Sequence, residues 1–206
     1  MVTDASPRIR EQIVNATYDL MHEIGVGALT TKAIAERAGC AEGSIYRYFP
    51  DKHALIREIV HAHLGTFRDL ITTLPDRAGS GSVRGNLEQV GLLALQFFRQ
   101  VVPIVAVAIS DPALKAQLRL HWDEHDTGPV RSINQLAEYI RREQRLGRAA
   151  KSVSADHTAR LLLGAWFSRI MLENMTAELG TEDDVRHVKD LVRTLYEGLR
   201  PPDDLS

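Results

Sequence analysis

The chain has 206 residues, of which 44% are hydrophobic and 25% are charged. This apolar fraction excludes a chain that is mainly disordered. The one cysteine, Cys40, excludes a disulfide framework and a cysteine-rich zinc fold. No stretch of 18 apolar residues occurs, so we expect no membrane-spanning helix. The polar N-terminal segment does not have the pattern of a signal peptide.

The charge balance does not by itself favour nucleic-acid binding. The net charge is −2, and the first 60 residues carry seven Lys and Arg against eight Asp and Glu. Neither number indicates a broad electrostatic attraction to a phosphate backbone. A DNA-binding function must therefore depend on where the charges lie.

Helical patterns follow one another along the chain, and no alternating run predicts a strand. We therefore expect an all-α fold. Ser6 is the expected N-cap of the first helix, and Gly25 ends it. The expected caps of later helices are Thr30, Asp51, Asp111 and Ser154. The helices expected in the first third of the chain cover residues 7–24, 30–39, 41–48 and 51–74.

A segment rich in glycine, proline and serine lies between Leu74 and Gly85 and predicts a domain boundary. Beyond it, Pro103 is expected to kink a long helix, because proline removes a backbone donor. Thr181 is expected to cap the last helix. The helices expected here cover residues 87–109, 129–146 and 154–179, with others starting after Asp111 and after Thr181.

The segment 30–49 predicts a helix-turn-helix, that is, two short helices with Gly39 in the turn between them. Ala35 is small enough to let the helices cross closely, and Ile34 and Ile45 can face each other. Such packing leaves the outer face of the second helix free to enter a DNA major groove. Short helix pairs also occur as plain packing units, so the spacing alone leaves both interpretations open.

The outer face of the second helix carries side chains that suit DNA. Arg47 can donate two hydrogen bonds to guanine or contact a phosphate. Glu42 can accept a hydrogen bond from cytosine or repel a phosphate, and Gly43 lets the backbone come close. The candidate DNA-binding residues are Thr31, Lys32, Glu42, Gly43, Ser44, Tyr46, Arg47, Tyr48 and Lys52.

This region resembles the DNA-binding domain of the tetracycline-repressor (TetR) family of bacterial regulators. The resemblance covers residues 7–67. Ala41 departs from the family pattern, because a residue whose side chain can cap the recognition helix is frequent there. The matching residues are Leu29-Thr30-Thr31, Ile34-Ala35, Ala38-Gly39, Gly43-Ser44-Ile45-Tyr46-Arg47-Tyr48-Phe49, Lys52 and Leu55.

The resemblance implies an all-helical homodimer that binds a palindromic DNA operator. It also implies a C-terminal helical domain, expected over residues 83–200, that binds a small-molecule effector and dimerises. A regulator of this kind works in the cytoplasm without a cofactor and is not an enzyme. Repression and activation of transcription are both compatible with the sequence. The helix over residues 51–74 joins the two domains and is the expected route of coupling between them.

The implied ligand pocket has candidate apolar lining, although aromatic residues at helical spacing are more often plain core. These candidates are Phe97, Phe98, Ile104, Trp122, Trp166, Phe167 and Met171. The resemblance places the dimer interface on the last two helices, although the same helices could pair within one chain. The interface candidates are Leu161, Gly164, Ala165, Val188, Leu191 and Leu195.

One motif suggests a different class of protein. His121, Glu124 and His125 fit the pattern H-x-x-E-H, which on a helix could bind zinc as in the inverted zinc-peptidase motif. A metal-dependent hydrolase is therefore the alternative function. No third ligand is identifiable in the sequence, so we expect no metal site, and a solvated helix face is the simpler interpretation.

Overall fold

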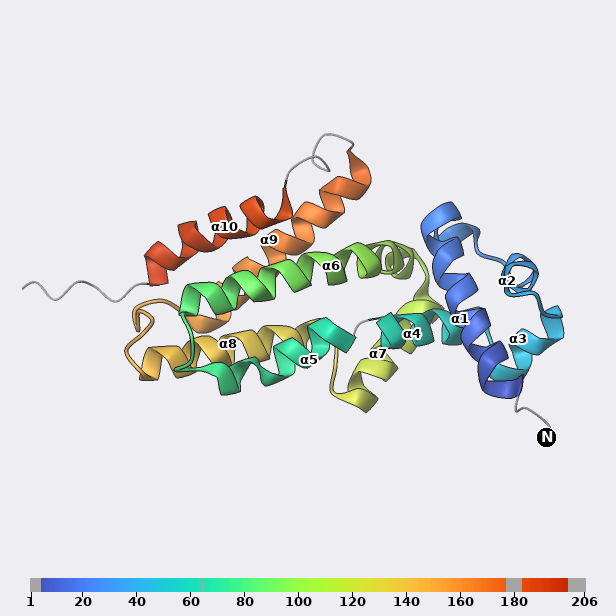
Figure 1. Ribbon diagram of the computed structural model, residues 1–206, viewed down its shortest axis with the longest axis horizontal. Coiled ribbons are helices and arrows are strands. Elements are labelled where there is room, and N and C mark those ends of the chain that lie inside the picture. The colour runs from blue at the N-terminus through green and yellow to red at the C-terminus, as the bar shows by residue number, and fades with distance from the viewer. Residues whose placement is uncertain (1–4, 64, 177–182, 200–206) are drawn as a thin grey trace, which may run out of the picture. The chain divides into compact units, whose positions relative to one another are not determined.

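The computed structural model describes residues 5–63, 65–176 and 183–199, and every regular element in these ranges is helical (Figure 1). The predicted all-α fold is confirmed. The elements are α1 (Ala5–Ile24), η1 (Val26–Ala28), α2 (Thr31–Ala38), α3 (Glu42–Tyr48), α4 (Lys52–His63), α5 (Gly65–Thr73), η2 (Leu74–Arg77), α6 (Val83–Ser110), α7 (Pro112–His125), α8 (Pro129–Arg145), α9 (Ala155–Met175) and α10 (Asp184–Leu199).

The chain folds into two compact units. The first unit contains α1 to α4, the end of α6 from Pro103 onward, and α7. The second unit contains α5, α6 up to Val102, α8, α9 and α10. The expected domain ranges, 7–67 and 83–200, stay predictions. The second of them includes Pro103–His125, which the structure groups with the first unit.

The glycine-rich segment expected at a domain boundary lies inside the second unit. Leu74 is fully buried there. Gly79 and Gly81 have φ angles of 84° and 61°, which glycine adopts without strain. The backbone N–H of Gly79 donates a hydrogen bond to the Glu143 carboxylate on α8 at 3.2 Å. The composition that predicted a linker therefore forms a turn against α8.

The predicted helix caps are largely confirmed. An Oδ or Oγ atom of each cap accepts a hydrogen bond from a backbone N–H in the first turn of its helix, which satisfies a donor with no partner inside the helix. These caps are Thr30 for α2, Asp51 for α4, Asp111 for α7 and Ser154 for α9. At the other end of α2, Gly39 has a left-handed φ of 65°, as predicted for a helix terminator.

Several helix boundaries differ from the prediction. α1 begins at Ala5, so Ser6 lies within the helix and is not its cap. α9 ends at Met175, four residues early, because the next residue is extended. Gly180 and Thr181, expected to end one helix and begin another, lie outside the described residues. At the start of α10, Asp183 accepts a hydrogen bond from the Val185 N–H at 2.9 Å.

One helix was expected over residues 51–74. The structure describes α4 up to His63 in the first unit and α5 from Gly65 in the second, and Leu64 between them lies outside the described residues, so the continuity of this helix stays a prediction. A different helix, α6, contributes to both units. Pro103 lies inside α6, and it is the residue at which the chain passes from the second unit to the first. α6 therefore contributes to both units as one helix, a connection that the sequence did not predict.

Each unit has its own hydrophobic core. In the first unit, Ile34 of α2, Ile45 of α3 and Leu55 of α4 are fully buried in one cluster. Ile104 of α6 and Leu114 of α7 belong to the same cluster. The helix-turn-helix packs against α1, α1 packs against α4, and α4 packs against α7, so all these helices share one core.

The core of the second unit is organised around Trp166 of α9, which is fully buried. A Cβ atom at Gly91 of α6 would lie 2.7 Å from the Trp166 ring and 2.7 Å from a methyl group of Val188. Glycine at this position thus lets α6 approach α9 and α10 closely.

By length and composition alone, one of the described helices, α6, could cross a membrane. The sequence predicted no such helix, because Gln96 and Arg99 interrupt the run of apolar residues in this segment. The core helix of a soluble protein passes the same test. In α6, Leu87 and Leu95 are fully buried in the core of the second unit.

Candidate nucleic-acid interface

The two helices of the predicted helix-turn-helix are packed by their inner faces. Ile34 and Ile45 are each 0% exposed, and Ala35 between them is 4% exposed. The turn begins at Gly39, whose N–H donates to the carbonyl of Glu36. Because α3 buries only Ile45 among its seven residues, most of its surface stays available to a partner.

The structure places the nine candidate DNA-binding residues in two groups by exposure. Glu42, Gly43, Tyr46 and Arg47 are exposed on α3, and Lys32 is exposed on α2. The partly buried members are Thr31, Ser44, Tyr48 and Lys52. None of the nine is buried, so the residues proposed from the sequence all reach the surface. Their contacts with DNA stay predictions.

A cluster that the sequence did not predict joins the starts of α2 and α3. The Thr31 hydroxyl donates a hydrogen bond to Oε1 of Glu42, and it lies 3.4 Å from the Tyr46 hydroxyl. Thr31 is the first residue of α2 and Glu42 is the first residue of α3. The sequence pattern gives no signal for this contact, because the contact depends on the angle at which α2 and α3 cross.

Gly43 has no structural reason within the chain to be glycine. A Cβ atom added there would meet no atom within 4 Å. Gly43 is not among the residues with positive φ, so the backbone does not require glycine either. Glycine in a helix costs about 0.5–1 kcal/mol relative to alanine. Gly43 therefore leaves open space at the surface of α3.

The N-cap of α3 is weak, as the sequence predicted. Ala41 occupies the cap position and makes no side-chain hydrogen bond to the first turn. The carboxylate of Glu42 lies in that first turn instead. A negative charge at this end is favourable because it is the positive end of the helix dipole.

α4 begins directly after the recognition helix and is held by α7 through two aspartates. Asp51 caps α4 with Oδ1, and its Oδ2 accepts a hydrogen bond from the Gln117 amide of α7 at 3.2 Å. In the reciprocal contact, Asp111 caps α7 with Oδ1, and its Oδ2 lies 3.0 Å from His53 of α4. Each aspartate therefore fixes one helix start and touches the other helix.

These contacts lower the pKa of both carboxyls. For Asp51, burial acts to raise the pKa, but hydrogen bonds from the Ala54 N–H and the Gln117 amide outweigh it. For Asp111, the hydrogen bond from the Leu114 N–H is the largest cause, and the contact with His53 lowers the pKa further. Both side chains are therefore negatively charged at neutral pH.

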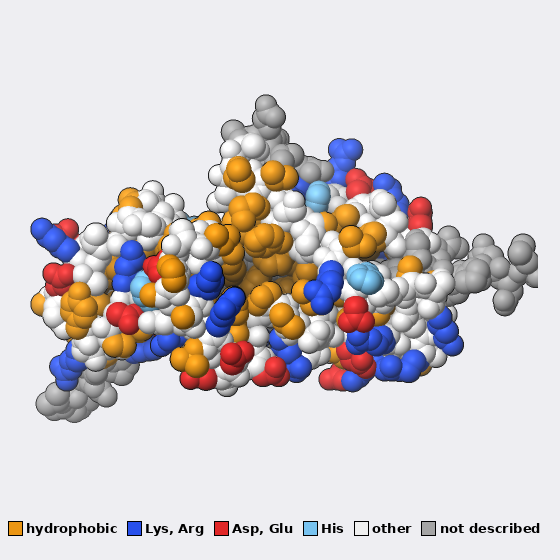
Figure 2. Space-filling view, turned by 180° about the vertical axis from the view of Figure 1, so that it is seen from behind, with side chains coloured by type: hydrophobic (Ala, Val, Ile, Leu, Met, Phe, Trp, Pro, Cys, Tyr) orange, Lys and Arg blue, Asp and Glu red, His pale blue; other side chains and the backbone are white. Residues whose placement is uncertain are grey.

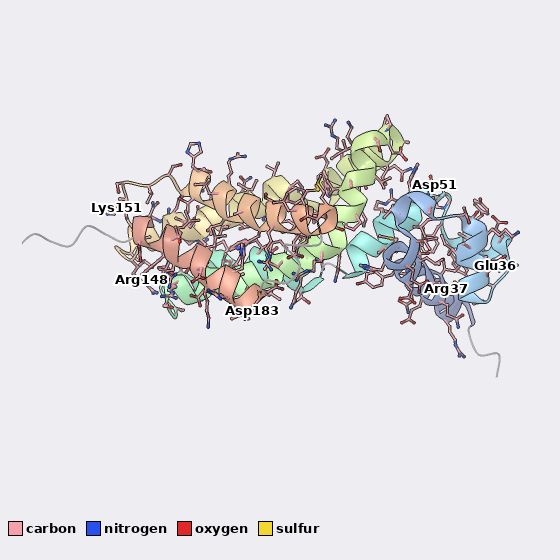
Figure 3. All side chains as sticks on the ribbon, turned by 90° about the horizontal axis from the view of Figure 1, so that it is seen from above. Glu36, Arg37, Asp51, Arg148, Lys151 and Asp183 are labelled. Atoms are coloured by element: carbon pink, nitrogen blue, oxygen red, sulfur yellow. The ribbon has the colours of Figure 1, made fainter. Side chains whose placement is uncertain are left out.

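Some arginines of the first unit are paired with carboxylates within the chain, and other described cations are not. Arg37, labelled at the end of α2 in Figure 3, forms a two-pronged ion pair with Glu23 of α1. Arg10 pairs with Glu58 at 2.8 Å. Among the described residues, no carboxylate forms an ion pair with Lys32, Arg47 or Lys52, so these three cations are available to phosphates. Lys32 and Arg47 are exposed, and Lys52 is partly buried.

The candidate pocket residues do not form one group. Ile104 and Trp122 pack in the core of the first unit, whereas Phe97, Phe98, Trp166, Phe167 and Met171 pack in the second. Within the second unit the aromatic rings form a chain of contacts. Phe98 lies 5.3 Å from Phe97 and 5.5 Å from Phe167, measured between ring centroids. Phe67 of α5, which the sequence did not predict, lies 4.6 Å from Phe97.

The candidate dimer residues also divide. Val188 is fully buried in the core of its own chain, and Leu191 and Leu195 pack partly against that core. Leu161 is 59% exposed, and Gly164 has open space beside it. The buried members of the set thus show that α10 turns its apolar face inward.

The exposed apolar side chains on α9 extend beyond the prediction. Leu172 and Met175 are 40% and 74% exposed, and Figure 2 shows hydrophobic side chains at the surface near the end of α9. Together with Leu161, Gly164 and Ser168 they form a stripe along one side of the helix, which we call the α9 stripe. The opposite side of α9 carries Trp166 in the core, so α9 is apolar on two faces.

The H-x-x-E-H residues do not form a metal site. The rings of His121 and His125 lie 4.2 Å apart, and Nδ1 of His125 is 2.9 Å from the carbonyl oxygen of His121. In the described part of the chain, no group of three or more His, Cys, Asp or Glu residues is arranged to hold a metal ion. The hydrolase alternative therefore has no support from the structure.

Two crossed helices with an exposed second helix, set on a small helical core, make this chain a helix-turn-helix DNA-binding protein in class. Residues 13–59 match the family model described as bacterial regulatory proteins, tetR family. The chain is 29% identical to the HTH-type transcriptional regulator UidR of Escherichia coli K12, over 97% of this chain and 93% of UidR.

Solved structures share the fold over both units. A TetR-family transcriptional regulator from Mesorhizobium loti superposes with a TM-score of 0.71 at 19% identity, covering 95% of this chain and 98% of that one. FadR from Bacillus subtilis, solved in complex with stearoyl-CoA, gives a TM-score of 0.67 at 15% identity, covering 91% and 98%. Residues 13–59 therefore form a DNA-binding domain of the TetR family of transcriptional regulators.

Proposed function

We propose that this regulator is a ligand-responsive repressor that binds a palindromic DNA operator as a homodimer in the cytoplasm. The observation that carries the proposal is the exposed face of α3. Arg47 and Tyr46 are exposed there, and Gly43 leaves the backbone open to a partner. This face has the chemistry of a base-reading surface, and its exposed residues are not part of the buried core.

The proposed DNA contacts divide into base and phosphate contacts. Arg47 can donate a two-pronged pair of hydrogen bonds to guanine in the major groove. Lys32 at the start of α2 and Lys52 at the start of α4 lie beside backbone N–H groups at helix starts, which favour phosphates. Further hydroxyl groups that could contact the DNA strands belong to Ser44, Tyr46 and Tyr48. The phosphate contacts would set the register, and the base contacts would set the sequence.

The α9 stripe supports dimerisation. A helix that is apolar on two faces is stable when both faces are covered. The core of the second unit covers the Trp166 side, and a second copy of the chain would cover Leu161 and its neighbours. A two-fold dimer presents two recognition helices, and these read two half-sites about one helical turn, or roughly 34–36 Å, apart.

The second unit is the proposed place for the effector. FadR, which shares the fold, was solved with stearoyl-CoA. In this chain the aromatic chain from Phe67 to Phe167 offers apolar contacts in the second unit. α6 places side chains in both cores, so a ligand that shifts α6 in one unit would act on the other. A ligand that prefers a conformation unable to bind DNA lowers the affinity for DNA. Bound DNA lowers the affinity for that ligand by the same factor.

The test is a gel-shift assay with the DNA on either side of the regulator's own gene. We expect a shifted complex at nanomolar to micromolar protein, and Arg47→Ala should weaken it by about 1–3 kcal/mol. Arg186→Ala is the matched control, because Arg186 is an exposed arginine (78%) of the second unit. Unchanged binding by Arg47→Ala would remove that residue from the reading surface, and a reporter gene would separate repression from activation.

A further inference from the structure

We propose that Glu42 selects the base at one position of each half-site and that Thr31 is the positioning residue that orients its carboxylate. This inference rests on the proposed function and assigns a role within the same surface. In the proposal, Glu42 accepts a hydrogen bond from the exocyclic amino group of cytosine in the major groove. The favoured partner is therefore a half-site with cytosine at that position.

The geometry places Glu42 at the end of α3 that approaches bases first. Glu42 is the first residue of α3, and Tyr46 follows one helical turn later on the same side. Both are exposed, and Tyr46 has 54% of its surface accessible. The carboxylate is therefore part of the face that would enter the groove.

The carboxylate is held by one oxygen only. Thr31 donates its hydroxyl proton to Oε1 of Glu42, and the Tyr46 hydroxyl lies 3.4 Å from the Thr31 oxygen. A hydroxyl has a single proton to donate. Thr31 therefore cannot donate to DNA while it holds Glu42, so in this proposal it orients Glu42 instead of donating to DNA directly. Oε2 of Glu42 stays free to accept from a base.

The cost of a carboxylate at this position indicates a gain in selectivity. A negative charge beside the DNA backbone weakens binding to every sequence. The start of α3 stabilises the charge in the free protein through the helix dipole. At the base edge, an acceptor is repelled by guanine and thymine, which present acceptors there, and is satisfied by the amino group of cytosine. Adenine also presents an amino group, but its N7 acceptor lies beside that group and repels the carboxylate. Glu42 thus lowers affinity for wrong sequences more than for the right one.

The experiment uses the full-length protein and a library of double-stranded oligonucleotides with a randomised central segment. Bound DNA is selected and sequenced for the wild type, Glu42→Ala and Glu42→Gln. We expect the wild type to enrich cytosine at one position in each half-site. Glu42→Ala should lose about five- to 150-fold of that preference, while its affinity for random DNA rises. Glu42→Gln should move the preference toward adenine, to which an amide can bind in two places.

The positioning role is tested with Thr31→Val and Thr31→Ser. Valine keeps the shape and removes the hydroxyl, so the cytosine preference should fall at the same position and at no other. Serine keeps the hydroxyl and should restore the preference. Thermal unfolding of the four variants checks that each is folded, and a purely structural contact would change the unfolding temperature without changing the base preference.

Each outcome decides a separate point. If Glu42→Ala binds every sequence more tightly with unchanged preferences, Glu42 is only a repulsive surface charge and the inference is wrong. If Thr31→Val retains the full preference, Thr31 does not position Glu42. If the wild type enriches no sequence while folded and dimeric, the proposed operator-binding function fails rather than the role of Glu42.

Discussion

The two units expose different kinds of surface, and each kind indicates a different partner. In the first unit, α3 exposes Glu42, Tyr46 and Arg47, which are polar groups that can form directed hydrogen bonds. In the second unit, α9 exposes Leu172 and Met175, which gain free energy only when water is removed. A polar face on a short helix suits DNA, whereas an apolar stripe on a long helix suits a second protein surface.

The comparison also shows which residues each unit can change without unfolding. On α3 the exposed residues contribute little to packing, because Ile45 alone buries the helix against the core. In the second unit α9 contributes on both sides, with Trp166 in the core and the α9 stripe outside. Substitutions on α3 should therefore separate binding from stability, whereas those on α9 should affect stability or assembly.

The largest expected effect is in the core of the second unit. Trp166→Ala should lower the free energy of unfolding by about 3–5 kcal/mol, because it leaves a cavity in the core. The cavity would lie beside Gly91, where α6 packs closely against the Trp166 ring. Chemical denaturation followed by circular dichroism measures the change. Arg186→Ala, on the surface of the same unit, should change stability by no more than about 0.5 kcal/mol. Equal stability of Trp166→Ala and the wild type would contradict the packing described for α9.

The next effect tests the α9 stripe. Leu161→Glu should convert a dimer to a monomer, because a carboxylate buried at the interface without a partner costs several kcal/mol. Sedimentation velocity at micromolar concentration measures the change. Leu120→Glu is the matched control, since Leu120 is exposed to a similar degree (56% against 59%) but lies on α7. A wild type that sediments as a monomer, or identical behaviour of both variants, would exclude the stripe as the interface.

A smaller effect separates stability from DNA binding on α3. Gly43→Ala should stabilise the free protein by about 0.5–1 kcal/mol, because alanine favours the helix and the added methyl group meets no atom of the chain. The same methyl group should weaken DNA binding, since it lies where the backbone approaches the bases. Thermal unfolding and a gel shift on one preparation measure both. Tighter DNA binding by the variant would show that α3 does not approach DNA at this residue.

The smallest expected effect is a loss of stability in acid. A hydrogen bond and ion pair with Arg99 lower the pKa of Asp184 below its ordinary value of 3.8, and the pKa values of Asp51 and Asp111 are lowered as well. Their stabilisation is complete above the ordinary pKa and is lost as the pH falls through the lower folded values. Unfolding midpoints in urea should therefore be constant from pH 7 to about pH 5 and fall below about pH 4.

Asp184→Asn gives the control for the acid effect. The variant should lose stability at neutral pH, because Arg99 and the buried Arg169 lose a charged partner. It should also show a shallower decline in acid than the wild type. A decline of equal steepness in both proteins would mean that Asp184 does not contribute to the pH dependence.

Local signals in the sequence were sufficient for the ends of most helices. Thr30, Asp51 and Asp111 act within their own first turn, so their role depends only on neighbouring residues. The helix-turn-helix was also predictable, because Gly39 and the apolar spacing around it define the turn locally. These features need no knowledge of the rest of the chain.

Contacts between distant residues could not be predicted in this way. Gln117 reaches Asp51 over 66 positions, and the contact exists because α4 and α7 pack together. Val188 was expected on an interface, but whether an apolar residue of α10 faces inward or outward depends on the rotation of that helix. The glycine-rich segment after Leu74 has the composition of a linker, and only the position of Glu143 makes it a packed turn.

The continuity of α6 has a consequence for how this regulator can change. Adding one residue to an α-helix rotates everything after it by about 100°. An insertion in α6 between Leu95 and Ile104 would therefore rotate the part of α6 in the first unit relative to the part in the second. After His125, by contrast, the chain crosses between the units outside a helix. Among natural variants, insertions and deletions should be tolerated after His125 and be rare within α6.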